Sequence, residues 1–300
     1  MTFIVKTSNL WKSYGDKKAL VGVSLHIPEG EIYGLLGPNG AGKTSIIGII
    51  SGILRFDKGN FSIAGKKHVS QIKNLVGLVP QDAQLYYDMT CLNHLIFFAK
   101  LQGFNKLAAK QESLRVLKLV DLFSEQNNKV GSLSHGMRRR LGFAQALIGS
   151  PKVLILDEPT NGLDPSIAKS IRLLILELKK SNTTIIFSSH NIYEVEEICD
   201  SIGILNKGKL IKEGLIKNLK KTNSVFVSVR GLKKEVIKRI KKKHYVKRLN
   251  EGLNSLEVEF KHGDFTNDLL KFLIDNSLVI DKFKKGESLE DIFLDIVGKK

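Results

Sequence analysis

Short apolar runs alternate with amphipathic stretches along the first two thirds of the chain. The runs are too short for helices and are typical of buried strands, and a helical pattern separates each of the later pairs. This order predicts βαβ units around a parallel sheet. Upstream, alternating positions over Phe3–Asn9 and Val21–Ile27 predict antiparallel strands. The apolar runs are Glu31–Leu36, Leu75–Val79, Val153–Leu156, Thr184–Phe187 and Ile202–Leu205.

The middle of the chain follows a helical period instead. Apolar residues recur three and four positions apart, so that they share one helix face in each of three segments. This spacing predicts an α-helical subdomain over about residues 89–149. The residues are Leu92, Leu95, Ile96 and Ala99, then Leu114, Leu117 and Val120, then Leu141, Ala144 and Ile148.

The strand and helix pattern restarts after the lysine-rich stretch Gly214–Thr222, which is typical of a linker between domains. The elements that follow have the order βαββαβ, as in ferredoxin-like domains, with one additional helix. We therefore predict two domains, residues 1–220 and 221–300. The predicted elements are strand Ser224–Val229, helix Lys233–Lys241, strands His244–Leu249 and Ser255–Phe260, helix Phe265–Asp275, strand Leu278–Phe283 and helix Leu289–Val297.

A glycine-rich segment joins the strand at Glu31–Leu36 to a helical pattern at Ile46–Ile50. The segment, Gly37–Thr44, fits the phosphate-binding pattern G-x-x-x-x-G-K-[ST]. Its glycines let backbone N–H groups turn toward one anion, Lys43 adds a positive charge, and the Thr44 hydroxyl can reach Mg²⁺. The sequence therefore predicts binding of a nucleoside triphosphate by Gly37, Pro38, Asn39, Gly40, Ala41, Gly42, Lys43, Thr44 and Ser45.

Two acidic residues follow the apolar run Val153–Leu156. A buried strand delivers both carboxylates to its C-terminal end, where α/β sheets bind their ligands. We expect Asp157 to hold Mg²⁺ and Glu158 to act as the general base for the attacking water. An ordinary strand with a solvated acidic end is the competing interpretation, and the phosphate-binding pattern upstream argues against it.

The segment Leu133-Ser134-His135-Gly136-Met137 resembles the L-S-G-G-Q signature of the nucleotide-binding subunits of ABC transporters. The resemblance implies that Ser134 and Gly136 contact the γ-phosphate bound by the opposite subunit. His135 and Met137 stand where the signature has glycine and glutamine. A serine that caps a helix N-terminus explains the pentapeptide equally well.

The resemblance extends over about residues 3–220 and implies roles for four further residues. Tyr14 matches the aromatic residue that stacks on adenine, and Gln81 matches the glutamine that ligates Mg²⁺ and senses the membrane partner. Asp164, in Gly162-Leu163-Asp164, lies in the loop that crosses the dimer interface, and His190 matches the catalytic switch histidine. The implied fold is an α/β P-loop NTPase with an antiparallel β-subdomain and an α-helical subdomain, followed here by a small α+β domain.

Two segments are similar to ATPases that drive ABC-2-type exporters: Leu85–Thr90, and the tail Ser288–Leu294. An amphipathic terminal helix also explains the tail. The resemblance implies an ATPase that uses ATP and Mg²⁺, forms a head-to-tail homodimer and powers a separately encoded membrane permease. Such a subunit would be cytoplasmic and peripheral on the inner face of the cell membrane.

Composition bears on the partners. The chain has a net charge of +17, and its basic residues are concentrated in Arg230–Arg248 with Tyr245 as the one aromatic residue there. Stacking on nucleic-acid bases is therefore not indicated, and a solvated face is favoured. No apolar run approaches the roughly 20 residues that span a bilayer. Two other classes remain open: a soluble ABC ATPase acting on ribosomes or DNA, and a regulatory subunit with little turnover.

Overall fold

The computed structural model describes residues 2–82, 84–219, 224–252, 254–261, 263–286 and 289–298. The chain divides into two compact units, Met1–Leu215 and Ile216–Lys300. The domain boundary that we predicted, between residues 220 and 221, falls outside the described residues, as does Ser288 of the tail resemblance.

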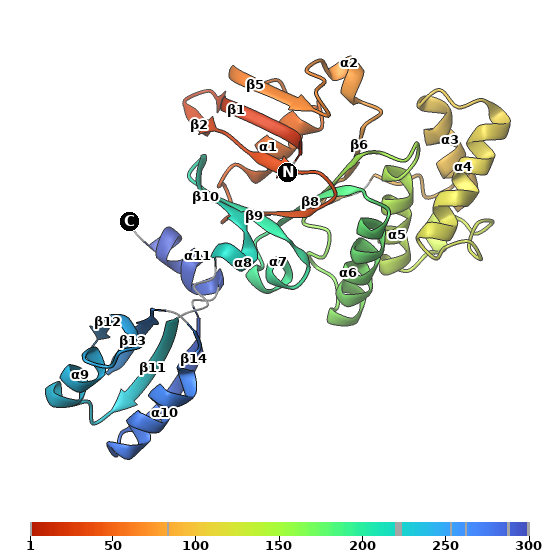
Figure 1. The fold of residues 1–300 in the computed structure, drawn as a ribbon. Coiled ribbons are helices and arrows are strands. Elements are labelled where there is room, and N and C mark those ends of the chain that lie inside the picture. The colour runs from red at the N-terminus through yellow and green to blue at the C-terminus, as the bar shows by residue number, and fades with distance from the viewer. Residues whose placement is uncertain are drawn as a thin grey trace. The chain divides into compact units, whose positions relative to one another are not determined.

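A six-stranded sheet forms the centre of the first unit (Figure 1). Its strand order is β10-β9-β4-β8-β7-β6, and all neighbours are parallel except β9 and β10. Every residue of β4 and β8 is buried, as expected for parallel strands covered on both faces. The strands are β4 (Ile32–Leu36), β6 (Val76–Val79), β7 (Val153–Asp157), β8 (Thr184–Ser189), β9 (Ser201–Asn206) and β10 (Lys209–Leu215).

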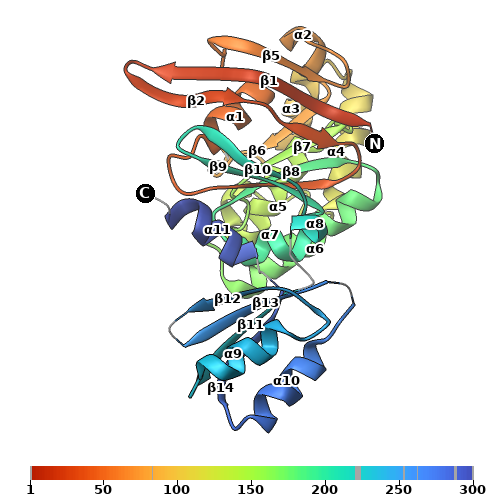
Figure 2. The same cartoon turned by 60° about the vertical axis from the view of Figure 1, so that its left-hand side comes forward.

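Helix α1 (Lys43–Ile50) lies between this sheet and an antiparallel sheet, and helices α5 (His135–Ala146), α6 (Pro165–Lys180) and α7 (Ile192–Ile198) cover the other face (Figures 1 and 2). Ile46 and Ile49 of α1 pack in one core with Leu35 of the parallel sheet and Leu10 of the antiparallel sheet. The antiparallel sheet contains β1 (Phe3–Tyr14), β2 (Lys17–Val23), β3 (His26–Pro28) and β5 (Lys58–Ile63).

The segment Val21–Ile27, predicted as one strand, belongs to two strands. Strand β1 pairs with β2 and with β3, and the break falls between them at residues 24 and 25. The hydroxyl of buried Thr7 accepts a hydrogen bond from Leu25 N and donates one to Val23 O. At the break, the Thr7 side chain supplements the backbone bond from Thr7 N to Leu25 O, which the alternation pattern does not indicate.

The predicted helical region contains α3 (Cys91–Leu101), α4 (Lys106–Leu119), a 3₁₀ turn (Val130–Ser132) and α5, and a short helix α2 (Val69–Ile72) precedes it. Thr90 and Asn105 cap α3 and α4 by accepting backbone hydrogen bonds. Buried Leu95 and Leu117 confirm the apolar faces expected there.

The expected linker is wrong for its first part. Strand β10 continues through Gly214 and Leu215, which pair with Ile202 and Ser201 of β9, and α8 (Ile216–Leu219) follows directly. Backbone pairing with β9 does not depend on the lysine-rich composition from which the linker was inferred.

The second unit has the predicted order of elements. Its sheet order is β12-β13-β11-β14 with all neighbours antiparallel. Val225, Val227 and Val229 alternate onto one face and share a core with α9 and α10. The elements are β11 (Ser224–Arg230), α9 (Lys234–Lys241), β12 (Val246–Gly252), β13 (Ser255–Phe260), α10 (Thr266–Asp275), β14 (Val279–Lys285) and α11 (Leu289–Gly298). In neither unit do the described residues include a helix that is long and apolar enough to cross a membrane.

Candidate functional site

The phosphate-binding pattern forms the turn between β4 and α1. Gly42 at the start of α1 has φ 108°, and a Cβ there would lie 2.7 Å from Ala19 O. A Cβ on Gly37 would lie 2.5 Å from Leu205 O. Both positions therefore require glycine, which keeps the backbone close to its neighbours. The free N–H groups of the first turn of α1 and the helix dipole favour an anion here.

Lys43 is 6% exposed, and its Nζ donates to Gly37 O at 2.7 Å and to Pro38 O at 3.4 Å. The carboxylate of Glu158 lies 3.6 Å from the same Nζ. A buried ammonium is costly unless it is paired. The two carbonyls and one carboxylate hold the Lys43 ammonium beside the glycine turn. A nucleotide bound at the turn would place its phosphates next to this charge.

The carboxyl ends of β7 and β8 bring the predicted catalytic groups together. Ser188 donates to Asp157 Oδ1 at 2.7 Å and accepts from Glu158 N at 2.9 Å. His190 Nδ1 lies 3.0 Å from Glu158 Oε2. Glu158 has φ 45°, a left-handed conformation that is uncommon for residues other than glycine. The turn thereby directs the Glu158 side chain between Lys43 and His190.

A cavity of about 370 Å³ opens over these groups, and its lining comes from five separate stretches of the chain. It is lined by Tyr14, Gln81, Asp157, Glu158 and His190, together with most of the turn before α1. Gly37 and Pro38, which were predicted with the turn, are absent from the lining. Lys17, Ala19 and Asn161 also line it, and the sequence did not point to them. The turn residues in the lining are Asn39, Gly40, Ala41, Gly42, Lys43, Thr44 and Ser45.

The lining suits a magnesium nucleotide. Thr44 and Gln81 offer neutral oxygens and Asp157 one carboxylate, a ligand set typical of Mg²⁺ bound together with substrate phosphates. Ser188 donates a hydrogen bond to Asp157 Oδ1. This bond fixes the orientation of the carboxylate and therefore of its second oxygen, Oδ2. Tyr14 is 48% exposed, and Lys12 Nζ lies over its ring, 5.3 Å from the centroid.

The signature-like segment lies outside this cavity. Ser134 is the N-cap of α5 and accepts from Met137 N at 3.3 Å, so the capping interpretation agrees with the structure. His135 is exposed, and a Cβ on Gly136 would lie 3.0 Å from Ile167. Asp164 is exposed at the N-cap of α6. Ser134, His135, Gly136, Met137 and Asp164 are absent from the cavity lining within one chain.

The sequence reasoning missed a buried arginine that supports the site. Arg139 of α5 is 8% exposed and donates to four carbonyl oxygens. The acceptors are Pro80 O (3.0 Å), Gln81 O (2.7 Å), Glu158 O (3.2 Å) and Pro159 O (2.9 Å). Desolvation lowers the pKa of Arg139 from its ordinary value. A signal existed, because Arg139 shares a helix face with the buried residues Phe143 and Ala146.

Residues 20–161 match the sequence profile of the family described as ABC transporter. The bacitracin transport ATP-binding protein of Bacillus licheniformis is 34% identical over 99% of this chain and 98% of its own length. The linearmycin resistance ATP-binding protein of Bacillus subtilis is 32% identical over 99% of both chains.

Solved structures give the same relationship. An ATP-binding cassette of an ABC transporter in its ADP conformation matches with a TM-score of 0.66 at 27% identity, over 72% of this chain and 92% of the other. A dimeric cassette in a post-hydrolysis state bound to ADP and Pi matches with a TM-score of 0.63 at 26% identity, over 70% and 98%. The chain therefore belongs to the ABC transporter family, in which it is an ATP-binding and ATP-hydrolysing subunit.

Proposed function

We propose that this chain is the ATPase of an exporter and powers a separately encoded membrane permease. The observation that carries the proposal is the cavity that joins the glycine turn, Gln81, Asp157, Glu158 and His190. A relative named for Nod factor export supports the outward direction of transport, and relatives named for bacitracin transport and linearmycin resistance are compatible with it. In this role the chain lies in the cytoplasm, held at the inner face of the membrane by the permease.

The roles proposed for the site residues are those that the sequence and the family resemblance imply, and the geometry of the cavity supports them. Lys43 and the backbone of the glycine turn bind the β- and γ-phosphates, and Tyr14 stacks on the adenine. Thr44, Gln81 and Asp157 hold Mg²⁺, which neutralises charge on the phosphates. Ser188 keeps Asp157 in place by its hydrogen bond.

Glu158 is the general base in this proposal. Its carboxylate is 11% exposed and lies between two nitrogen atoms, Lys43 Nζ and His190 Nδ1. Glu158 accepts a proton as water attacks the γ-phosphate. When both ring nitrogens of His190 carry protons, Nδ1 donates to Glu158 and orients the carboxylate, and Nε2 can donate to the γ-phosphate.

A second copy of the chain completes each site. Ser134 and His135 are exposed at the N-terminus of the twelve-residue helix α5, a position that favours an anion. In the head-to-tail homodimer, Ser134, Gly136 and their neighbours in the signature-like segment face the γ-phosphate held by the partner subunit. The loop with Asp164 lies at the same interface. A relative of 26% identity forms a dimer with ADP and Pi, which supports this arrangement.

Two measurements test the proposal. Glu158→Gln should retain Mg-ATP binding and lose turnover by roughly 10²–10⁴-fold, the usual contribution of a general base. Glu177→Gln is the matched control, because Glu177 is 70% exposed on α6 and pairs only with Lys180 among the described ion pairs. Affinity purification from detergent-solubilised membranes should recover a polytopic membrane protein. Wild-type turnover in Glu158→Gln refutes the catalytic assignment, and recovery of ribosomes or DNA refutes the transporter role.

A further inference from the structure

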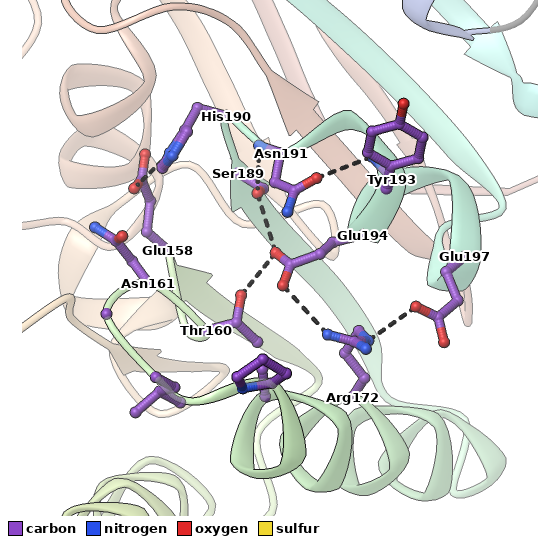
Figure 3. Close-up of a pocket in the computed structure, with 14 residues that line it drawn as sticks. Glu158, Thr160, Asn161, Arg172, Ser189, His190, Asn191, Tyr193, Glu194 and Glu197 are labelled. Carbon is purple, nitrogen blue, oxygen red and sulfur yellow. Dashed lines mark hydrogen bonds and ion pairs between the residues drawn. The ribbon is translucent and has the colours of Figure 1, made fainter.

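A single carboxylate, that of Glu194 on α7, contacts three other elements beside the nucleotide cavity (Figure 3). Glu194 Oε2 accepts from Thr160 Oγ1 at 2.7 Å and from Ser189 Oγ at 3.3 Å. Glu194 Oε1 accepts from Arg172 of α6 at 3.3 Å. These contacts border a second cavity, of about 420 Å³, which Glu158 and His190 also line.

The two hydroxyl donors lie beside the proposed catalytic pair along the chain. Thr160 follows Glu158 by two residues, and Ser189 directly precedes His190. Ser189 also accepts from Asn191 N at 2.9 Å, so its hydroxyl donates to Glu194 and accepts from the residue that follows His190. Thr160 and Ser189 are 7% and 4% exposed, respectively. Glu194 thus connects the segment after β7 to the end of β8 through two hydroxyl groups that are largely buried.

The direct bond between the catalytic residues is less protected. His190 is 52% exposed, so its bond to Glu158 lies in a solvated part of the site. The Glu194 carboxylate is 12% exposed, and Arg172, at 17%, balances its charge. Buried, charge-assisted hydrogen bonds hold geometry better than exposed ones. Glu194 therefore adds a second connection between the segments that carry Glu158 and His190, beside the hydrogen bonds of Ser188 to Asp157 and to Glu158 N.

We propose that Glu194 is a positioning residue for ATP hydrolysis, which holds the Glu158 loop and the His190 loop in register. The inference rests on the catalytic roles proposed above for Glu158 and His190. Glu194 is not among the residues that line the nucleotide cavity. Displacing a catalytic group by about 1 Å can reduce a rate by roughly 10²-fold. Loss of Glu194 should accordingly lower kcat and leave nucleotide affinity nearly unchanged.

The test compares Glu194→Ala with Glu197→Ala in the full chain. Glu197 lies on the same helix and pairs with the same Arg172, but its side chain is 56% exposed and neither loop is among its described partners. Glu194→Ala should lower kcat by about 10- to 100-fold, with the Kd for Mg-ATP changed by less than about threefold. Glu197→Ala should match the wild type. Equal kcat in the two variants, or a loss of ATP affinity equal to the loss of kcat, overturns the proposal.

Thr160 provides a second, smaller perturbation that keeps the proposal testable if Glu194→Ala does not fold. Thr160→Val removes the hydroxyl at nearly constant shape and should lower kcat. Thr160→Ser keeps the hydroxyl and its bond to Glu194, so its kcat should stay near the wild-type value. If the two variants have equal kcat, the hydroxyl and its hydrogen bond to Glu194 do not affect hydrolysis, and the proposal is contradicted.

A double-mutant cycle separates this inference from the proposed function. In a Glu158→Gln background, the part of the effect that acts through the base is already lost, so Glu194→Ala should lower the residual turnover by a clearly smaller factor than in the wild type. An additional loss as large as in the wild type indicates an effect that does not act through the position of Glu158 and overturns the positioning role. If Glu158→Gln alone keeps wild-type turnover, the catalytic assignment fails instead. If Glu158→Gln is inactive and Glu194→Ala is fully active, the positioning role alone fails.

Discussion

Arg139 offers the sharpest test of how the fold supports the site. Its guanidinium connects the loop after β6, which carries Gln81, to the loop after β7, which carries Glu158. We consider Arg139→Met, which removes the donors at similar side-chain length. Four carbonyl oxygens then lose a charged donor in a region where Arg139 itself is 8% exposed.

The magnitude follows from these contacts. The hydrogen bond to Pro159 O is buried, and those to the other three oxygens are partly buried. A buried acceptor left unpaired costs about 1–3 kcal/mol, and water recovers part of that cost at a partly buried one, so the four together cost about 3–6 kcal/mol. Relaxation of the loops and the recovered desolvation cost of the guanidinium offset part of this, which leaves a net loss of about 2–5 kcal/mol. For a unit of this size, about 1 kcal/mol shifts Tm by roughly 2–4 °C, so Tm should fall by roughly 4–20 °C.

Differential scanning calorimetry with and without Mg-ATP measures the shift, and steady-state turnover measures the effect on the site. Arg138→Met is the matched control, because the neighbouring Arg138 lies over the Tyr87 ring at 5.7 Å, an interaction of about 0.5–1 kcal/mol. Arg139→Lys should recover part of the stability, since an ammonium cannot reach four acceptors at once. If Arg139→Met and Arg138→Met unfold at the same temperature, the four hydrogen bonds do not support the site.

Three further predictions follow from the structure. Lys43→Ala should weaken Mg-ATP binding by at least about 10²-fold in a calorimetric titration, because the variant lacks the charge at the glycine turn; unchanged affinity contradicts the site. Burial lowers the pKa of His94 below its ordinary 6.5, so the unfolded chain binds the proton first and stability should fall as pH drops below about 6.5. His94→Gln should flatten that dependence in urea titrations between pH 5 and pH 7, an assay range set by the ordinary histidine pKa, and exposed His68→Gln should not. A chain ending at Leu215 should fold and bind Mg-ATP like the full chain, because the core around α1 and every cavity-lining residue precede that position; an insoluble product contradicts the division into two units.

The sequence by itself determined the elements whose causes are local. Uninterrupted apolar runs identified the buried strands β4, β7 and β8, since a strand covered on both faces has no polar position to alternate. The glycine turn before α1 was also evident from the sequence. Gly37 and Gly42 have no room for a Cβ, so the fold requires the glycines that make the pattern visible. Asp157 and Glu158 were predictable because a parallel strand delivers its last residues to the ligand-binding edge.

Only the tertiary structure decided which polar side chains support those residues. Ser188 becomes a partner of Asp157 through the parallel register of β7 and β8, in which the two residues are paired. Arg139 contacts residues that lie about 20 to 60 positions away along the chain. Glu194 contacts residues that lie 5 and 34 positions away. A hydrogen bond depends on the position of an atom to within a few tenths of an ångström. That position is set by the packing of α5, α6 and α7 against the sheet, and residue type and spacing along the chain do not encode it.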